Sequence, residues 1–468
     1  LPQWTDVQGK VTLNPNADHR VSLLAYYSQD RVGARQEDPA VAGNEATQGD
    51  FRYRNDFWRA AFEWKARADD RFRNDLTFSV GQDMQRFEVG QFAVVDVDSF
   101  WWMLREEAEI DLHEALTLRA GADIIATLFG FDFEFANFNV RGFGDDPTSE
   151  RESLSLAERD FAFGPAAFIE ARVKLLDERI QLTPGLRADF YTIPDQFSFG
   201  TLDPRFNFRF SPDPRKMMDI KGSVGLYHQN PQGFEIVEAT GNTDLQPEES
   251  VQVTLGTEIR FTDFLSLDVQ GFYKRLDKLV TFNSGLAENR DGLWQNNGDG
   301  HIGGGELFFR LRPWKGLEGW VSLTVMRSWR RECPECDPRP FDFDQPVLLD
   351  VVLSYALPYG FRVGGRFRYA SGNPETPIID SIYDADTDNY IGLSGAPNSQ
   401  RLPAFHALDI RIDKDINFRR WKLTVYLDLM NVYNQKNPEQ RVYNFDYTEQ
   451  DFLYGLPILP NLGFKAQF

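Results

Sequence analysis

Two cysteines lie close together in the sequence and could form either a disulfide bond or part of a metal site. They are Cys333 and Cys336, in the order Cys-Pro-Glu-Cys, within a polar stretch that is predicted to be an outer loop. Tetrahedral zinc normally takes four ligands, and the five histidines of the chain lie far apart in the sequence. Disulfides persist outside the cytoplasm. The spacing therefore predicts a disulfide, with free or redox-active thiols and a metal site as the alternatives.

A run of alternating aspartates is the second candidate for chemistry. Asp384, Asp386 and Asp388 have the spacing with which calcium-binding loops begin. Such loops also require a glycine at the sixth position and a glutamate at the twelfth. Asn389 and Gly395 occupy these positions here. The segment is therefore predicted to be a solvated acidic loop, and a Ca²⁺ site formed by the three aspartates is the weaker alternative.

The other residue patterns do not indicate catalysis. The glycine-rich stretches at 296–300 and 303–305 follow no strand-to-helix pattern, so they do not predict a phosphate-binding loop. The sequence shows no Ser-His-Asp order, no nucleophile elbow and no pair of carboxylates in a catalytic setting. We therefore predict that the protein is not an enzyme and has neither catalytic residues nor a cofactor.

The elements that must position these residues are predicted to be β-strands, because apolar and polar residues alternate along most of the chain. Leu423, Val425 and Leu427 share one face of a strand, and Thr424 and Tyr426 share the other. The polar faces carry Arg, Asp, Lys and Gln over about ten residues, whereas globular strands run to about five or six. A wet interior and a lipid-facing exterior explain this pattern. The same period occurs at 205–210, 220–227, 251–261 and 408–413.

Short predicted turns alternate with long polar stretches along the chain, which is typical of outer-membrane barrels. The short turns lie at 14–18, 68–71, 112–115, 177–179, 213–215, 262–264, 314–318, 358–360 and 417–419. The long stretches lie at 32–50, 129–155, 230–246, 283–293, 330–340, 373–401 and 435–439. We therefore predict an all-β fold, a transmembrane antiparallel β-barrel of about 19 strands. Residues 1–468 are expected to form this barrel as one domain.

Composition limits the alternatives to this prediction. The chain has 468 residues and a formal net charge of −21, which argues against a nucleic-acid partner, since phosphate binding requires clustered Lys and Arg. The mean hydropathy is negative, and no run of about 18 apolar residues occurs, which excludes a helical membrane protein. A membrane β-barrel is compatible with this low hydropathy, because only alternate residues of its strands face lipid.

Several segments resemble the TonB-dependent receptor family of bacterial outer-membrane transporters. The most extensive is Asp-Leu-Gln-Pro-Glu-Glu-Ser at 244–250, followed by Leu-Gly-Thr-Glu at 255–258. The chain also finishes on an alternating strand with a terminal Phe468, which resembles the C-terminal strand of outer-membrane proteins. The first half of the chain matches the family only in its pattern of alternating strand residues and turns. Further matching segments lie at 297–298 with 304–307, at 371–374, at 401–409 and at 428–434.

The resemblance implies location in the bacterial outer membrane and import of a scarce nutrient of the siderophore, cobalamin, glycan or peptide class. The substrate would be captured by the extracellular loops and the upper lumen, although no individual substrate-binding residue is predicted. The implied partners are outer-membrane lipid, an inner-membrane energy-transducing TonB-type protein and, in some cases, a surface lipoprotein. A passive porin-like channel without a plug and a structural or adhesion barrel are the alternative functions.

The chain departs from the family pattern at its N-terminal end. The family's barrels have about 22 strands around a plug domain, yet no plug and no energy-coupling box are recognised after Leu1. If Phe468 lies in the periplasm, the strand at 4–13 runs inward from the outer surface. We therefore expect a split receptor, completed by a plug-bearing N-terminal fragment or chain that also supplies about three strands. A smaller, complete barrel is the alternative.

Overall fold

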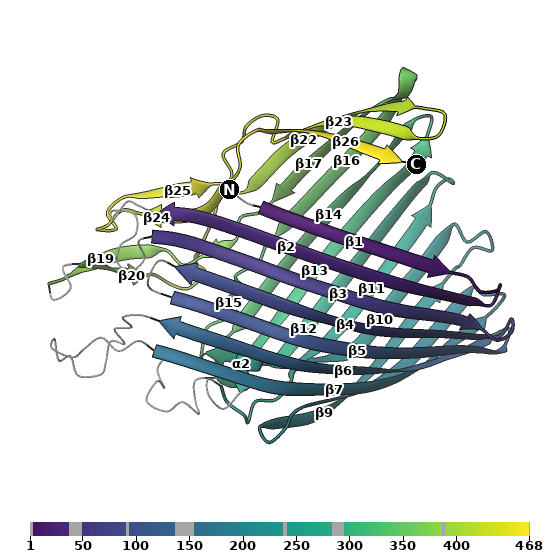
Figure 1. Cartoon of the computed structure of the whole chain (residues 1–468), viewed down its shortest axis with the longest axis horizontal. Coiled ribbons are helices and arrows are strands. Elements are labelled where there is room, and N and C mark those ends of the chain that lie inside the picture. Colours follow the sequence, from purple (N-terminus) through teal and green to yellow (C-terminus); the bar gives the residue numbers. More distant parts are fainter. Residues whose placement is uncertain are drawn as a thin grey trace.

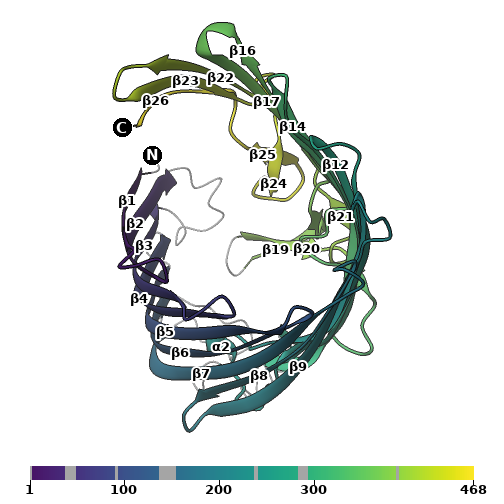
Figure 2. The same cartoon turned by 90° about the vertical axis from the view of Figure 1, so that its right-hand side faces the viewer.

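The structure, a computed structural model, describes residues 3–36, 49–89, 93–135, 154–236, 241–282, 294–385 and 389–467. Most of these residues belong to β-strands, and most of the strands form one large antiparallel sheet that curves into the wall of a barrel (Figures 1 and 2). The described residues contain no helix that is long and apolar enough to cross a membrane. The predicted fold class, an all-β antiparallel barrel of outer-membrane type, is confirmed.

Within the described residues, the main sheet has 20 strands. All of them except the two-residue strand β15 run from one end of the wall to the other, and this number agrees with the predicted number of about 19. We call these the crossing strands. The crossing strands are β1 (Gln3–Leu13), β2 (His19–Gln36), β3 (Gly49–Arg67), β4 (Phe72–Val89), β5 (Ala93–His113), β6 (Leu116–Phe135), β7 (Leu154–Leu175), β8 (Ile180–Ile193), β9 (Phe197–Phe210), β10 (Met218–Gln229), β11 (Glu248–Arg260), β12 (Leu265–Phe282), β13 (Trp294–Trp314), β14 (Leu317–Arg331), β16 (Val347–Leu357), β17 (Phe361–Ala370), β22 (Phe405–Asn417), β23 (Lys422–Met430) and β26 (Leu459–Gln467).

The remaining elements are short and belong to the connections between crossing strands. They are the helix α2 (Gly233–Ile236), the 3₁₀ turn η4 (Pro358–Gly360) and the strands β15 (Arg339–Pro340), β18 (Pro374–Glu375), β19 (Ile378–Asp384), β20 (Asn389–Ser394), β21 (Gln400–Arg401), β24 (Pro438–Tyr443) and β25 (Gln450–Tyr454). The hairpins β19–β20 and β24–β25 lie within the ring of crossing strands when the barrel is viewed from its end (Figure 2).

The register between neighbouring strands is long and mostly continuous. Strands β2 and β3, for example, pair from His19 with Ala66 to Gln36 with Gly49 without a shift. Because side chains alternate between the two faces of a sheet, such a register fixes which residues share a face across the whole wall. The position of one residue relative to the membrane therefore determines the positions of its neighbours.

The two faces of the wall differ in chemistry. On one face large aliphatic side chains are exposed, with Leu255 at 59 %, Leu23 at 56 % and Ile169 at 53 %. On the other face charged residues such as Asp123 and Asp219 are buried among neighbouring strands. An apolar outer band and a polar interior are what a membrane barrel requires. We call these the outward and the inward face.

The connections at one end of the barrel are short. Among the tightest is the two-residue turn between β13 and β14, in which Lys315 has φ of 50° and Gly316 has φ of 86°. Two consecutive positive φ angles match the twist of an antiparallel hairpin, and glycine adopts such an angle without steric cost. The longer connections lie at the opposite end, which confirms the predicted alternation, although the connections between β4 and β5 and between β8 and β9 at that end are short.

The two edge strands of the sheet run in the same direction. Among the described strands, β1 pairs only with β2 and β26 only with β23. Both run from the long-loop end to the short-turn end, and they form the two edges of the ring in the end view (Figure 2). Every residue of β1 is exposed. A direct pairing of β1 with β26 would therefore be parallel, unlike every other pairing in the sheet.

Candidate functional site

The inward face of β5–β8 carries a network of ion pairs. Arg119 donates two hydrogen bonds of 2.6 Å to the carboxylate of Glu107, one from Nε and one from Nη2. Arg187 bridges two carboxylates, with Nη1 2.7 Å from Asp123 and Nε 2.8 Å from Asp189. Paired guanidinium and carboxylate groups keep side chains charged in a partly buried setting. This part of the lumen is thus lined by charges held in fixed positions.

A second network lies on β9–β11. Its centre is Asp219, whose side chain is 4 % exposed and contacts Arg260 at 2.9 Å and Arg209 at 3.2 Å. Both guanidinium groups also contact Glu258, and Ser211 donates a hydrogen bond to Asp219. The inward face therefore presents alternating charges to a hydrated lumen, which suits a polar solute or a polar domain inside the barrel.

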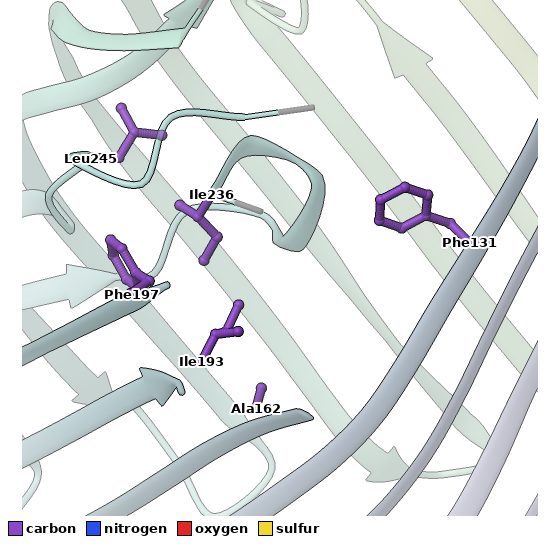
Figure 3. Close-up of a cluster of buried hydrophobic side chains, with 6 residues drawn as sticks. All are labelled: Phe131, Ala162, Ile193, Phe197, Ile236 and Leu245. Carbon is purple, nitrogen blue, oxygen red and sulfur yellow. The ribbon is translucent and has the colours of Figure 1, made fainter. Parts of the chain in front are cut away.

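An apolar cluster lies where the connection containing α2 folds against the inward face, near the long-loop end (Figure 3). Ile236 and Leu245 of this connection are buried in the same cluster as Phe131 and Phe197 of the wall. Asn242 fixes the connection by donating a hydrogen bond of 2.9 Å to the carbonyl oxygen of Trp294. Partly buried aromatic side chains surround the cluster. They offer apolar surfaces for stacking on the long-loop side of the charged networks. These side chains are Phe129, Phe133, Tyr191, Phe199 and Trp294.

Three connections at the long-loop end are tied together into an assembly. It comprises residues 332–346, 371–404 without the undescribed 386–388, and 431–458, and we call it the outer-loop assembly. Its most buried polar contact is Asp344, which is 1 % exposed. The Asp344 carboxylate accepts hydrogen bonds from Arg401, from the backbone N–H of Ser328 at 2.6 Å and from Arg327 at 3.3 Å. Asp344 therefore joins the first two connections to the top of β14.

The second and third connections of the assembly share an ion pair and backbone contacts. Arg441 Nε lies 2.7 Å from Glu375, and both side chains are largely buried, at 14 % and 16 % exposure. The Ser381 hydroxyl donates a hydrogen bond of 2.8 Å to the carbonyl oxygen of Asp446. Since the hairpins β19–β20 and β24–β25 lie inside the ring (Figure 2), this assembly stands at the mouth of the lumen.

The two cysteines lie in the first connection of the outer-loop assembly. The Cys333 and Cys336 sulfurs are at bonding distance, and their Cα atoms are 5.1 Å apart, which suits a disulfide. We expect N-ethylmaleimide to label neither cysteine in the purified, unreduced protein and to label both after reduction. Mass spectrometry of the peptide that contains them measures the labelling, and labelling before reduction would contradict the prediction.

The aspartate run is only partly described. Asp384 ends β19, whereas Asp386 and Asp388 lie outside the described residues. Within the described residues, no cluster of three or more His, Cys, Asp or Glu is arranged to hold a metal ion. Calcium binding by this run therefore stays a prediction.

One carboxyl group in the assembly should make its packing sensitive to acid. Burial by itself raises the pKa of Asp342, but hydrogen bonds from Asn398 at 2.6 Å and Arg339 at 2.9 Å outweigh it and lower the pKa below its ordinary value. A lowered folded pKa contributes stability above the ordinary value of about 3.9, and this stability is lost as the pH falls through the folded value.

We therefore expect pepsin to cleave residues 332–346 increasingly fast as the pH falls from about 4 to about 2. In Asp342→Asn the cleavage should start faster and depend less on pH, because the titrating group is absent. Rates are corrected with an unstructured peptide substrate. A wild-type rate that does not change after this correction would show that Asp342 does not hold the assembly.

The sequence alone did not identify the residues that hold the outer-loop assembly. Arg401 belongs to a segment that matches the family pattern, but its partner Asp344 carries no local signal, since the two are 57 positions apart. The charged residues of the inward face follow from the strand period, but their pairing partners do not. A candidate site of this kind becomes visible only with the register of the sheet.

These features define a class of protein: a large antiparallel barrel with a charged lumen and an ordered group of loops across one mouth. The family model for the TonB-dependent receptor-like β-barrel matches residues 2–432. The chain therefore belongs to the TonB-dependent receptor β-barrel family, as its segments indicated. Related barrels of this family are outer-membrane proteins, and the family and fold are those of receptors and transporters rather than of enzymes.

Solved structures share this fold over the whole chain. The FrpB iron transporter from Neisseria meningitidis aligns with a TM-score of 0.71 and 14 % identity, covering 99 % of this chain and 72 % of the other. The unliganded ferric citrate transporter FecA gives 0.71 and 13 %, covering 100 % and 70 %. The ferric-catecholate import receptor Fiu from E. coli gives 0.68 and 11 %, covering 99 % and 74 %. Comparison of the sequence with curated proteins gave no significant match.

Proposed function

We propose that this chain is the barrel wall of an energy-coupled importer in the bacterial outer membrane. The observation that carries the proposal is the outer-loop assembly, because it places ordered side chains across the mouth of a charged lumen. A passive pore has no need for loops that are tied together by buried ion pairs such as Glu375–Arg441. We further propose that the chain has no enzymatic role and no nucleic-acid partner.

The substrate is proposed to be a scarce nutrient of the siderophore, cobalamin, glycan or peptide class. The three structures named above are of iron or iron-chelate receptors, which favours a ferric chelate as the first substrate to test. Capture would take place between the outer-loop assembly and the aromatic cluster around Tyr191 and Trp294. Flat, partly buried aromatic side chains bind chelates and rings through stacking and apolar contact.

The directions of the edge strands support a completion of the barrel. Because β1 and β26 run in the same direction, an odd number of additional strands is needed to close the ring with antiparallel pairs. We propose that a plug-bearing N-terminal piece supplies about three strands and gives a barrel of about 22. A TonB-type protein would act on this plug, and outer-membrane lipid and a surface lipoprotein are further proposed partners.

Two measurements test these proposals. Cells that lack the chain should lose saturable uptake of radioactive ferric siderophore, and an uncoupler should abolish the uptake that the wild-type chain restores. Uptake that is insensitive to the uncoupler, together with steady conductance in planar bilayers, would favour a porin-like channel. Intact mass spectrometry of the complex extracted from the membrane should show a plug-bearing polypeptide, and a closed barrel without one would refute the completion.

A further inference from the structure

Three arginines stand side by side on one face of β2, β3 and β4. The register pairs Arg31 with Arg54, and Arg54 with Arg86. Residues directly opposite each other on antiparallel strands have Cβ atoms about 4.5–5.5 Å apart, and like charges in this position are destabilising. The pairing of these three arginines with one another therefore does not by itself stabilise the sheet.

The same register places the arginine row on the outward face. Tyr27 lies four residues before Arg31 on β2, nearer the middle of the wall, and pairs with Trp58. Leu23 lies four residues before Tyr27 and pairs with Phe62. An even spacing keeps Arg31, Tyr27 and Leu23 on one face, and Leu23 is 56 % exposed. The order along this face is thus aliphatic, then aromatic, then cationic.

The level of the row relative to the membrane follows from strand geometry. Four residues span about 14 Å along a strand, or about 10 Å along the axis of a barrel with tilted strands. Aromatic side chains such as Tyr27 and Trp58 are typical of the boundary between hydrocarbon and headgroups. The arginine row lies beyond them, toward the long-loop end, and therefore at the level of the headgroups of the outer leaflet.

An open pocket of about 470 Å³ lies over this row. It is lined by Arg31, Arg52, Arg54 and Arg86, with Glu88 as its single acidic residue. Two further carboxylates, Asp56 and Asp96, form ion pairs with Arg54 and Arg86 beside the pocket. Four guanidinium groups therefore face three carboxylates, and the remaining positive charge attracts an anion. Guanidinium groups bind phosphate in a bidentate manner, which makes arginine well suited to such a site.

The arginines also have carboxylate partners, but they keep donors for a ligand. Arg86 lies 2.6 Å from Glu88 and 2.7 Å from Asp96, and Arg52 lies 3.5 Å from Glu88. A guanidinium has five N–H donors, and the Arg86 side chain remains 49 % exposed.

A further pair involves Arg54 and Asp56, and the Arg54 side chain remains 52 % exposed. Arg31 is exposed and forms no ion pair with any other residue that the structure describes. The carboxylates thus hold the guanidinium groups of Arg54 and Arg86 in place and leave both side chains about half exposed.

We propose that the arginine row binds the phosphate groups of a phosphorylated glycolipid in the outer leaflet. The proposal rests on the proposed function, since it requires the long-loop end to lie at the cell surface. The site commits to a lipid because the row is on the outward face, where a bound headgroup leaves its acyl chains beside Leu23 and its neighbours. Free phosphate lacks this apolar contact.

The test uses purified protein in detergent and bis-phosphorylated lipid A as the probe. Native mass spectrometry counts retained lipid for the wild type, for Arg31→Gln/Arg54→Gln/Arg86→Gln, and for Arg71→Gln/Arg215→Gln/Arg419→Gln. The last variant is the matched control, because it removes the same charge from exposed turns at the short-turn end. Lipid A without phosphates and an excess of inorganic phosphate are the comparison ligands.

We expect the arginine-row variant to bind bis-phosphorylated lipid A about tenfold more weakly than wild type, because it loses three exposed charge contacts, each of which contributes modestly. The control variant should bind this lipid like the wild type, which would exclude an effect of net charge alone. The phosphate-free lipid should bind equally to all three proteins, which would exclude an effect of acyl packing. Equal binding by the arginine-row variant, or full displacement by inorganic phosphate, would overturn the lipid site.

Failure of the proposed function would look different. Both variants and the wild type are fractionated from cells, and their barrels are checked by the change in gel mobility on heating. A wild-type protein that is absent from the outer membrane would refute the proposed function, and the lipid site with it. A barrel that reaches the outer membrane but does not discriminate the phosphorylated lipid would refute the lipid site alone.

Discussion

Leu255→Arg is expected to destabilise the barrel by about 2–4 kcal/mol, the cost of an arginine on the lipid face near the middle of a membrane. Leu255 lies in the middle of β11, between Gly222 and Gly271 of the neighbouring strands, and is 59 % exposed. In a water-soluble protein, a substitution at so exposed a position would change stability by less than about 0.5 kcal/mol. The measurement is urea unfolding of the protein in lipid vesicles.

The matched control for this substitution is Gln270→Arg on the inward face of β12. Gln270 lies beside Gly256 and donates a hydrogen bond of 2.7 Å to Glu306, so an arginine there meets a carboxylate and water. We expect a change of about 1 kcal/mol or less. If the two variants unfolded at the same urea concentration, the assignment of outward and inward faces would be wrong.

Arg401→Ala is expected to release the outer-loop assembly from the top of β14. The substitution leaves the carboxylate of Asp344, which is 1 % exposed, with Arg327 and the backbone of Ser328 as its remaining partners. Removing one partner of a buried ion pair costs about 3–5 kcal/mol, and the partial exposure of Arg401 places this case near the lower end. Hydrogen exchange of residues 371–385 and 389–404 should accelerate by about a hundredfold.

Arg327→Ala provides a control on the same carboxylate. The Arg327 side chain is 56 % exposed and lies 3.3 Å from Asp344, so its loss should cost less than about 1 kcal/mol. Exchange in β16 and β17 should stay unchanged in both variants, because these strands are held by their own backbone pairing. Equal acceleration in the two variants would show that Arg401 has no special role in the assembly.

The same experiment bears on transport. If the outer-loop assembly captures the substrate, Arg401→Ala should reduce uptake at low substrate concentration, while the barrel remains folded. Under saturating substrate the loss should be smaller, because a looser loop weakens capture more than passage through the lumen. An uptake rate equal to that of the wild type at every concentration would place capture elsewhere.

Much of the wall could be predicted from local pattern. The alternation in 423–429 and 251–261 predicted strands with one apolar face, and the structure places β23 and β11 there. Counting the predicted turns gave the number of crossing strands. It also predicted that short connections gather at one end of the barrel and long ones at the other. These features are local, because alternate side chains of an extended chain point to opposite sides whatever their partners are.

The candidate site depended on the tertiary structure. The contact of Asp344 with Arg401 joins residues 57 positions apart, and that of Glu375 with Arg441 joins residues 66 positions apart. No local signal fixes such partners, since polar loop residues satisfy their hydrogen bonds equally well with water.

The arginine row shows the same division between sequence and fold. Along the sequence, Arg31, Arg54 and Arg86 lie in three separate strands and carry no common pattern. Only the register of β2, β3 and β4 brings them into one line on the outward face. The sequence by itself determined the strands, their two faces and the family, because period and turn chemistry act over a few residues. The fold decided which charges meet, because pairing between distant strands sets distances that no local pattern contains.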